Sequence, residues 1–88
     1  MGIYRHRPVV IEAYQFDGTD VSAAFIRKWS NDQVTGPFDM DSRPYLLIQT
    51  LEGMMKAHQG MWVIRGVAHE YYCCKNDIFW VSYEEVDG

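Results

Sequence analysis

The sequence predicts an α+β fold, in which one α-helix packs on a strongly bent antiparallel β-sheet of five or six strands. Two observations lead to this fold class. Short runs of β-branched and aromatic residues, separated by turn-like connections, fill the second half of the 88-residue chain. One amphipathic segment with helical spacing follows an earlier run of β-branched and aromatic residues. Short connections favour antiparallel neighbours. The expected order is strand, helix, four strands, a short helical turn and a last strand, all within one domain, 1–88.

The first strand and the helix are predicted near the start of the chain. Residues 8–16, PVVIEAYQF, form the strand, with both faces largely apolar. This predicts a central strand, in which Glu12 is an exception among apolar neighbours. The helix is expected to begin at Asp20, whose carboxylate can cap it, and to end near Trp29. Its predicted buried stripe has helical spacing and consists of Val21, Ala24, Phe25 and Trp29.

Residues 30–44 are predicted to form a loop, because they contain Gly, Pro and several acidic residues. A loop of this length is either functional or simply mobile and variable. Gly53, Gly60 and Gly66 are expected at bends, where a positive φ or a close backbone approach is needed. The remaining strands are predicted at 45–51, 54–58, 61–67, 69–75 and 81–86, with the helical turn at 76–80.

Charge and composition disfavour several classes of protein. Twelve acidic residues against eight basic ones give a net charge of −4, so binding to a nucleic-acid backbone is not expected. The basic residues Arg5 and Arg7 are interpreted as a solvated end of the chain. No run of about 20 apolar residues predicts a membrane span, and no signal-peptide core is visible. We therefore expect a cytosolic protein with reduced thiols at Cys73 and Cys74.

The sequence predicts no catalytic residues, no metal site and no cofactor. A zinc site would need Cys73, Cys74, His69 and His58, but adjacent cysteines on a strand point to opposite faces. His69 and Cys73 share a face of their predicted strand, yet four residues separate them by roughly 13 Å. Contact of a cysteine with a base would require His58 from a neighbouring strand. A small hydrolase that depends on these thiols or on Glu12 is therefore only the third interpretation.

A binding surface is the favoured interpretation. Arg65 and Lys75 are isolated bases on otherwise neutral strands, so either they pair with nearby acids or they face an anionic group. In the second case Trp62 or Tyr72 would stack a ring beside that group, as suits a small nucleotide-like ligand or an acidic partner protein. The predicted ligand- or partner-binding residues are Trp62, Arg65, Glu70, Tyr72, Lys75, Glu52 and Glu12.

Motif residues in the second half of the chain resemble those of small phage and prophage proteins. The shared pattern is approximately T-L-E-G-x-M-x-A-x-x-G-D-W-I-I-x-G-V-x-G-E-x-Y-P-C-K-P-D-I-F-x-x-T-Y-E, and residues 8–15 match the usual opening of these proteins. A looser resemblance extends to domains with a P-G-D-Y-G signature. The chain departs from the pattern at Met61, His69, Cys73 and Asn76.

The resemblance implies a phage or prophage origin, a host-cytoplasm location and an accessory role. The expected function is to bind, and so neutralise or sequester, a host defence protein or a nucleotide-like signal. The alternative is a homo-oligomeric structural or interaction module, in which the surplus aromatic residues build the subunit interface.

Overall fold

The computed structural model describes residues 2–3 and 10–86, and it confirms the α+β class. Within this part of the chain there are two helices and six strands rather than one principal helix and a single sheet. In chain order they are β1 (Glu12–Gln15), α1 (Asp20–Trp29), β2 (Val34–Met40), β3 (Arg43–Thr50), β4 (Gly53–His58), β5 (Trp62–Arg65), β6 (Tyr71–Cys74) and α2 (Asn76–Ser82).

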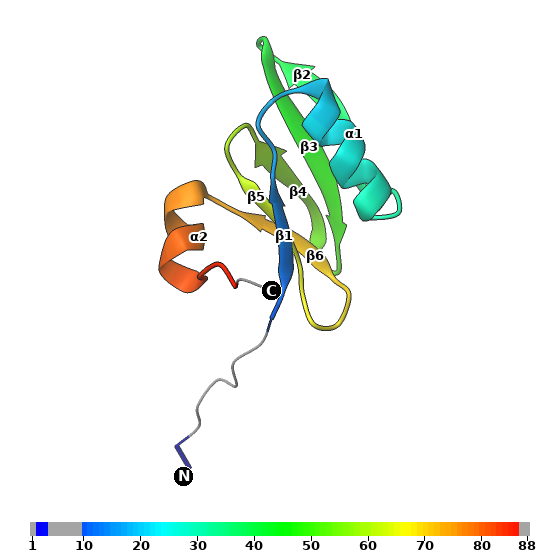
Figure 1. Ribbon diagram of the computed structural model, residues 1–88. Helices are drawn as coiled ribbons and strands as arrows, with labels where there is room; N and C mark the ends of the chain where they lie inside the picture. Colours follow the sequence, from blue (N-terminus) through cyan, green and yellow to red (C-terminus); the bar gives the residue numbers. More distant parts are fainter. Residues whose placement is uncertain (1, 4–9, 87–88) are drawn as a thin grey trace.

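The strands form two three-stranded antiparallel sheets (Figure 1). Sheet A has the order β1-β5-β6, and sheet B has the order β2-β3-β4. The predicted single sheet is wrong because β4 and β5 do not pair. At Gly60, where φ is 91°, the chain turns out of sheet B. Backbone bonds from Phe16 N to Met61 O (3.0 Å) and from Gly60 N to Phe16 O (2.7 Å) then direct β5 alongside β1.

One hydrophobic core joins the two sheets and α1. Sheet A contributes residues that include Val63 and Cys73, and sheet B contributes residues that include Leu46 and Ile48. Phe16, which follows β1, is fully buried in the same cluster. Burial of these side chains stabilises the fold by roughly 1.5–3 kcal/mol for each large aliphatic or aromatic group. The two sheets therefore form one packed unit.

A polar cap begins helix α1. Thr19 Oγ1 accepts a hydrogen bond from Ser22 N (3.1 Å), so Thr19 rather than the predicted Asp20 is the N-cap. Asp17 Oδ1 accepts from the Thr19 hydroxyl (2.5 Å), the Ser22 hydroxyl (2.7 Å) and Thr19 N (2.9 Å). These bonds lower the pKa of Asp17 to about 2, and the bond from the Thr19 hydroxyl has the largest effect.

The buried side of α1 differs from the predicted stripe. Ala23 and Ile26 are buried, and so is Ser30 directly after the helix. The predicted stripe is wrong at its exposed members, which are Val21, Ala24 and Phe25. Trp29 is half-buried against the core. The true stripe is hard to recognise because it includes a small residue and a polar one, and Ser30 is accommodated because its Oγ accepts from Val34 N (3.1 Å).

The predicted loop at 30–44 is wrong, because it contains strand β2 and the start of β3. The register between β2 and β3 shifts between Thr35 and Phe38, which marks an irregularity at Gly36. The Arg27 Nη1 atom donates to Gly36 O at 2.6 Å and so ties this irregularity to α1. Gly and Pro are tolerated here because β2 is an edge strand whose pairing with β3 is interrupted at this point.

Strand β1 is shorter than predicted and lies at an edge of sheet A, since its one partner among the described residues is β5. The central position predicted for 8–16 is therefore wrong, and residues 8–9 lie outside the described residues. Each face of β1 adjoins a helix. Tyr14 packs edge-on against Phe25 and Trp29, with ring centroids 4.7 and 4.8 Å apart, while the opposite face looks toward α2.

Helix α2 begins where the helical turn is predicted but continues to Ser82, so the predicted last strand at 81–86 is wrong. Tyr83 N donates to Phe79 O at 2.9 Å, which closes the helix. Helices α1 and α2 lie on opposite sides of sheet A (Figure 1). Among the described residues, no helix has the length and apolar character required to cross a membrane.

Candidate functional site

Strand β5 directs alternate side chains to the two faces of sheet A. Trp62 lies on the α2 face, where its ring stacks on that of Phe79 with centroids 4.2 Å apart and planes inclined by 6°. Trp80 meets both rings edge-on, at 5.6 Å from Trp62 and 5.2 Å from Phe79. Tyr83 is tilted against Phe79 at 5.2 Å. These four residues form the α2 aromatic cluster.

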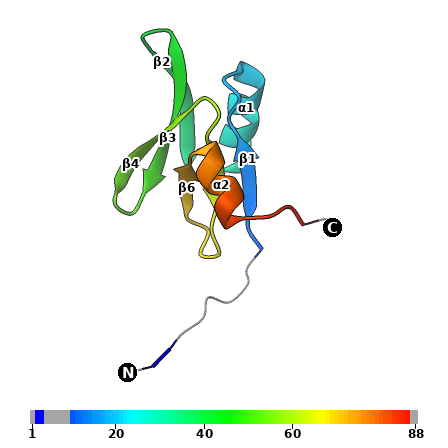
Figure 2. The ribbon, with the colours of Figure 1, turned by 90° about the vertical axis from the view of Figure 1, so that its left-hand side faces the viewer.

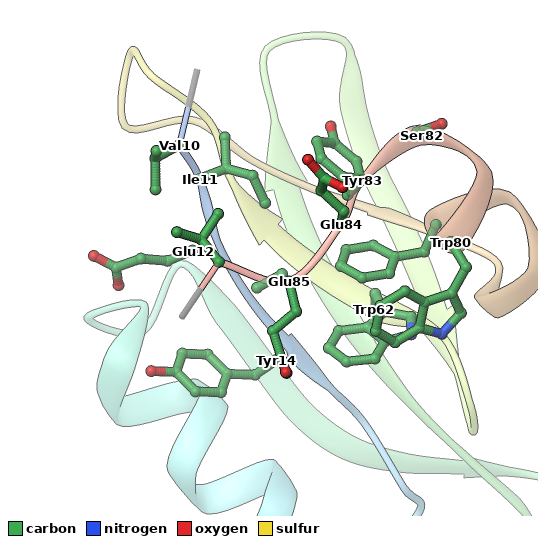
Figure 3. A pocket seen from close by; sticks show the side chains of 13 residues that line it. Val10, Ile11, Glu12, Tyr14, Trp62, Trp80, Ser82, Tyr83, Glu84 and Glu85 are labelled. Carbon is green, nitrogen blue, oxygen red and sulfur yellow. The ribbon is translucent and has the colours of Figure 1, made fainter. Parts of the chain in front are cut away.

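A groove of about 560 Å³ lies between this cluster, β1 and the segment after α2 (Figure 3); we call it the α2 groove. Exposed Glu84 and Glu85 lie along that segment, and both line the groove. Glu12 and Tyr14 lie at the margin, with side chains turned toward α1 (Figure 3). None of the described residues that line the groove is basic. Its further apolar lining consists of Val10, Ile11, Ala13 and Val86.

Hydrogen bonds fix the walls of the α2 groove. Asn76 Oδ1 accepts from Trp62 Nε1 (2.8 Å) and from Gln15 Nε2 (3.4 Å), and so connects the start of α2 to β5 and β1. The hydroxyls of Tyr72 and Tyr83 are 3.0 Å apart. Burial, and then this contact, raises the pKa of Tyr72, so the phenol stays protonated. The orientation of the cluster is therefore set by polar partners as well as by packing.

On the opposite face of sheet A, Arg65 is engaged by an acid. Its Nη2 atom donates to Glu12 Oε1 at 2.5 Å, and Trp29 Nε1 donates to Glu12 Oε2 at 2.8 Å. The bond from Trp29 and then the Arg65 charge lower the pKa of the Glu12 carboxyl. Of the two interpretations of Arg65, the structure shows the ion pair. Since Arg65 and Trp62 occupy opposite faces of β5, the structure does not bring them together around one ligand.

The other predicted residues are dispersed. Tyr72 shares the face of Trp62 and supports the groove through its hydroxyl. Lys75 is exposed just before α2, and Glu52 is exposed in the turn between β3 and β4. The carboxylate of Glu70 lies where a side chain at Gly66 would project, since a Cβ there would be 1.8 Å from Glu70 Oε1. Gly66 thus permits a close approach rather than a positive φ.

The two cysteines point to opposite faces of β6, as predicted. Cys73 is buried in the core, and Cys74 is half-buried on the α2 face. Burial raises the pKa of Cys73 to about 11 and also raises that of Cys74. An activated cysteine nucleophile requires a lowered pKa, so neither thiol has that property. In the described part of the chain, no three His, Cys, Asp or Glu side chains are grouped to hold a metal ion.

A second surface, on the outer face of sheet B, is not predicted from the sequence. Phe38, Tyr45 and His58 are register partners on three neighbouring strands and form a ring row across the sheet. Ring centroids are 5.7 Å apart for Phe38 and Tyr45, and 6.2 Å apart for Tyr45 and His58. The Lys56 Nζ atom lies 5.2 Å from the Tyr45 ring centroid. In Figure 2, α1 and β1 lie on the other side of this sheet.

One sequence signal could have revealed this surface. Asp41 and Ser42 both have positive φ, 51° and 62°, and join β2 to β3 as a tight hairpin. Polar residues of this type between two runs of hydrophobic residues are a recognised turn signal. The Gly-Pro pair inside 34–40 makes the first of these runs look unlike a strand, so Phe38 is not predicted to be the partner of Tyr45.

No protein-family model, curated protein or solved structure matches the chain. The resemblance to small phage proteins therefore remains an expectation from the motif residues. The chemistry of the two surfaces is the remaining basis for a functional conclusion.

Proposed function

We propose that the protein is a small phage-type accessory protein of the host cytoplasm, which acts by binding a host protein through the α2 groove. The observation that carries this proposal is the combination of exposed aromatic surface and carboxylates in one groove. Trp80 is 50% exposed at its wall although Trp is a costly residue to leave in water. Exposed aromatic side chains that surround a groove are typical of protein-interaction sites.

The charges of the groove favour a cationic partner. Glu84 and Glu85 are exposed at its edge, and the described lining residues include no base that would neutralise them. A partner segment that carries Lys or Arg would gain charge complementarity there, together with cation–π contact with Trp80. This differs from the acidic or anionic partner that the isolated bases predict.

The shape of the groove favours an extended segment. In the part of the chain that the structure describes, strand β1 has one neighbour, β5, so its second edge can accept another strand by backbone hydrogen bonding. Such a segment would place alternate side chains toward the α2 aromatic cluster. We therefore propose that the partner contributes an extended stretch of alternating basic and apolar residues. Occupation of that stretch would neutralise a host defence protein.

A synthetic peptide of alternating Lys and Phe residues tests the chemistry of the groove. We expect the peptide to shift the backbone amide resonances of β1, Trp62 and α2, with an affinity that falls as salt rises. The double variant Glu84→Gln/Glu85→Gln should weaken binding severalfold. The matched control is Asp32→Asn/Glu52→Gln, which removes the same charge from exposed positions elsewhere. Equal weakening by both double variants would mean that peptide affinity depends on net charge alone, and it would refute the groove as the binding site.

The biological role needs a separate measurement. Phage plating on defended host cells, with and without the expressed protein, should show rescue of infection that the variant Glu84→Gln/Glu85→Gln loses. Analytical ultracentrifugation addresses the alternative of a homo-oligomeric module. A stable oligomer that buries Trp80, with no rescue of infection, would favour that alternative instead.

A further inference from the structure

A second binding site lies on the outer face of sheet B. We propose that this face binds a nucleoside phosphate, with the base on the ring row and the phosphates at Lys56 and Arg43. The inference is independent of the proposed function, because the residues of this surface are not among those that line the α2 groove.

The ring row supplies a platform for a planar base. Phe38, Tyr45 and His58 come from β2, β3 and β4 at matching register positions, so their side chains project from the same face. Phe38 is 41% exposed and His58 is exposed, so both present ring surface to solvent, while half-buried Tyr45 between them carries the Lys56 ammonium over its ring. Aromatic side chains on a sheet face are a common way to stack nucleobases, because every base has a flat π surface.

Cations adjoin the platform. Lys56 extends over the Tyr45 ring, and Arg43 lies two residues before Tyr45 on the same face of β3. Among the described residues the ion pair is that of Arg65 with Glu12, so neither Lys56 nor Arg43 has a carboxylate within 4.0 Å there. Two cations without an ion-pair partner among the described residues lie beside a row of rings and provide the charge complementarity that a phosphorylated ring requires.

The ring row ends at a hollow of suitable size. The hollow has a volume of about 700 Å³ and is lined by Arg43, Pro44, His58, Gln59 and Asp41. This volume is within the range of small-molecule sites, which is roughly 300–1,000 Å³. Asp41 is the acidic group in the lining. It opposes an anion, so the affinity of the native protein is reduced by its presence.

The extent of the surface favours a single nucleotide over a nucleic-acid strand. Strand binding needs a track of several cations along the backbone, and the net charge of −4 opposes it. One short ring row, with Arg43 on one side and Lys56 reaching over Tyr45 from the other, offers room for one base and its own phosphates rather than for a strand. This is the ligand chemistry expected from the sequence, but it is assigned to sheet B instead of to Trp62, Arg65, Tyr72 and Lys75.

An NMR titration of the isotope-labelled full chain with ATP, AMP, adenosine and inorganic phosphate tests the site. We expect ATP to shift the resonances of Phe38, Tyr45, Lys56 and His58, and adenosine or phosphate alone to bind more weakly. The variant Tyr45→Leu should lower the affinity for ATP by roughly five- to a hundredfold, because a stacking ring is lost. Its amide spectrum shows directly whether the variant is folded.

Charge variants keep the test independent of folding at Tyr45. Lys56→Met should weaken ATP binding severalfold, whereas Lys75→Met, which removes the same charge near α2, should leave it unchanged. Asp41→Asn should tighten it. The proposal is overturned by an absence of shifts at millimolar ATP, by equal weakening in both lysine variants, or by shifts confined to the α2 groove. It is also overturned if oligothymidylates bind and ATP does not, since a strand would then be the ligand.

Discussion

Replacing Ser30 by alanine should destabilise the protein far more than an ordinary serine substitution. Ser30 is fully buried, and its Oγ accepts from Val34 N at 3.1 Å and donates to Arg27 O at 3.2 Å. Val34 is itself fully buried at the start of an edge strand, so water cannot readily replace the lost acceptor. Leaving a buried amide without a partner costs about 1–3 kcal/mol.

The predicted loss can be measured by equilibrium unfolding in urea and by thermal denaturation. For a domain of this size, 1 kcal/mol corresponds to a shift of about 4–8 °C in Tm, so Ser30→Ala should lower Tm by roughly 5–20 °C. Hydrogen exchange at the Val34 amide should accelerate as well. Ser82→Ala, at an exposed position, is the control and should change stability little. A free energy of unfolding within about 0.5 kcal/mol of the native value would refute this account of Ser30.

Three further outcomes are expected. Phe79→Ala should detach α2, because the stack on the indole of β5 is lost, at a cost of up to about 3–5 kcal/mol; near-ultraviolet circular dichroism measures the change, and an unaltered aromatic spectrum would contradict it. Its bonds to Thr19 lower the pKa of Asp17 to about 2, so the stability that the carboxylate provides is present above the ordinary Asp pKa and is lost as pH falls toward 2. The free energies of unfolding of the native protein and of Asp17→Asn, measured against pH, should therefore converge at low pH. Burial raises the pKa of Cys73 to about 11, so the stability that the buried thiol provides should be present below the ordinary thiol pKa and lost as pH rises through 11. Alkylation should modify the half-buried Cys74 first, and faster modification of Cys73 would contradict its burial.

The sequence predicts individual elements better than their assembly. Helix α1 and strands β3 and β4 are evident from local patterns of apolar residues and turns. Residues 34–40 conceal a strand because Gly and Pro are ordinarily excluded from strand interiors, whereas here the register with β3 is interrupted between Thr35 and Phe38 and Arg27 bonds to Gly36 O. The division into two sheets depends on the pairing of β5 with β1, a contact that no local pattern encodes.

The candidate sites show the same distinction. Trp62 and Glu12 line the α2 groove, and Tyr72 supports it through its hydroxyl; these aromatic and charged residues on strands are conspicuous in the sequence, but whether they bind a partner stays a prediction. Trp62 and Arg65 were expected to act together, but residues three apart on a strand face opposite sides. The ring row is not predictable from local sequence, because its members lie on three strands. The register that aligns them is set by the fold.

The division of the chain between the sheets has a consequence for biosynthesis. Sheet B consists of consecutive strands, so its hairpins can assemble as soon as they leave the ribosome. Sheet A must close a separation of 53 residues between Glu12 and Arg65, and such long loops form late. Until then the nascent polypeptide already presents the ring row of Phe38, Tyr45 and His58, whereas the α2 groove lacks the wall that β1 provides. Of the two surfaces, the α2 groove would thus be the last to form in each newly made copy.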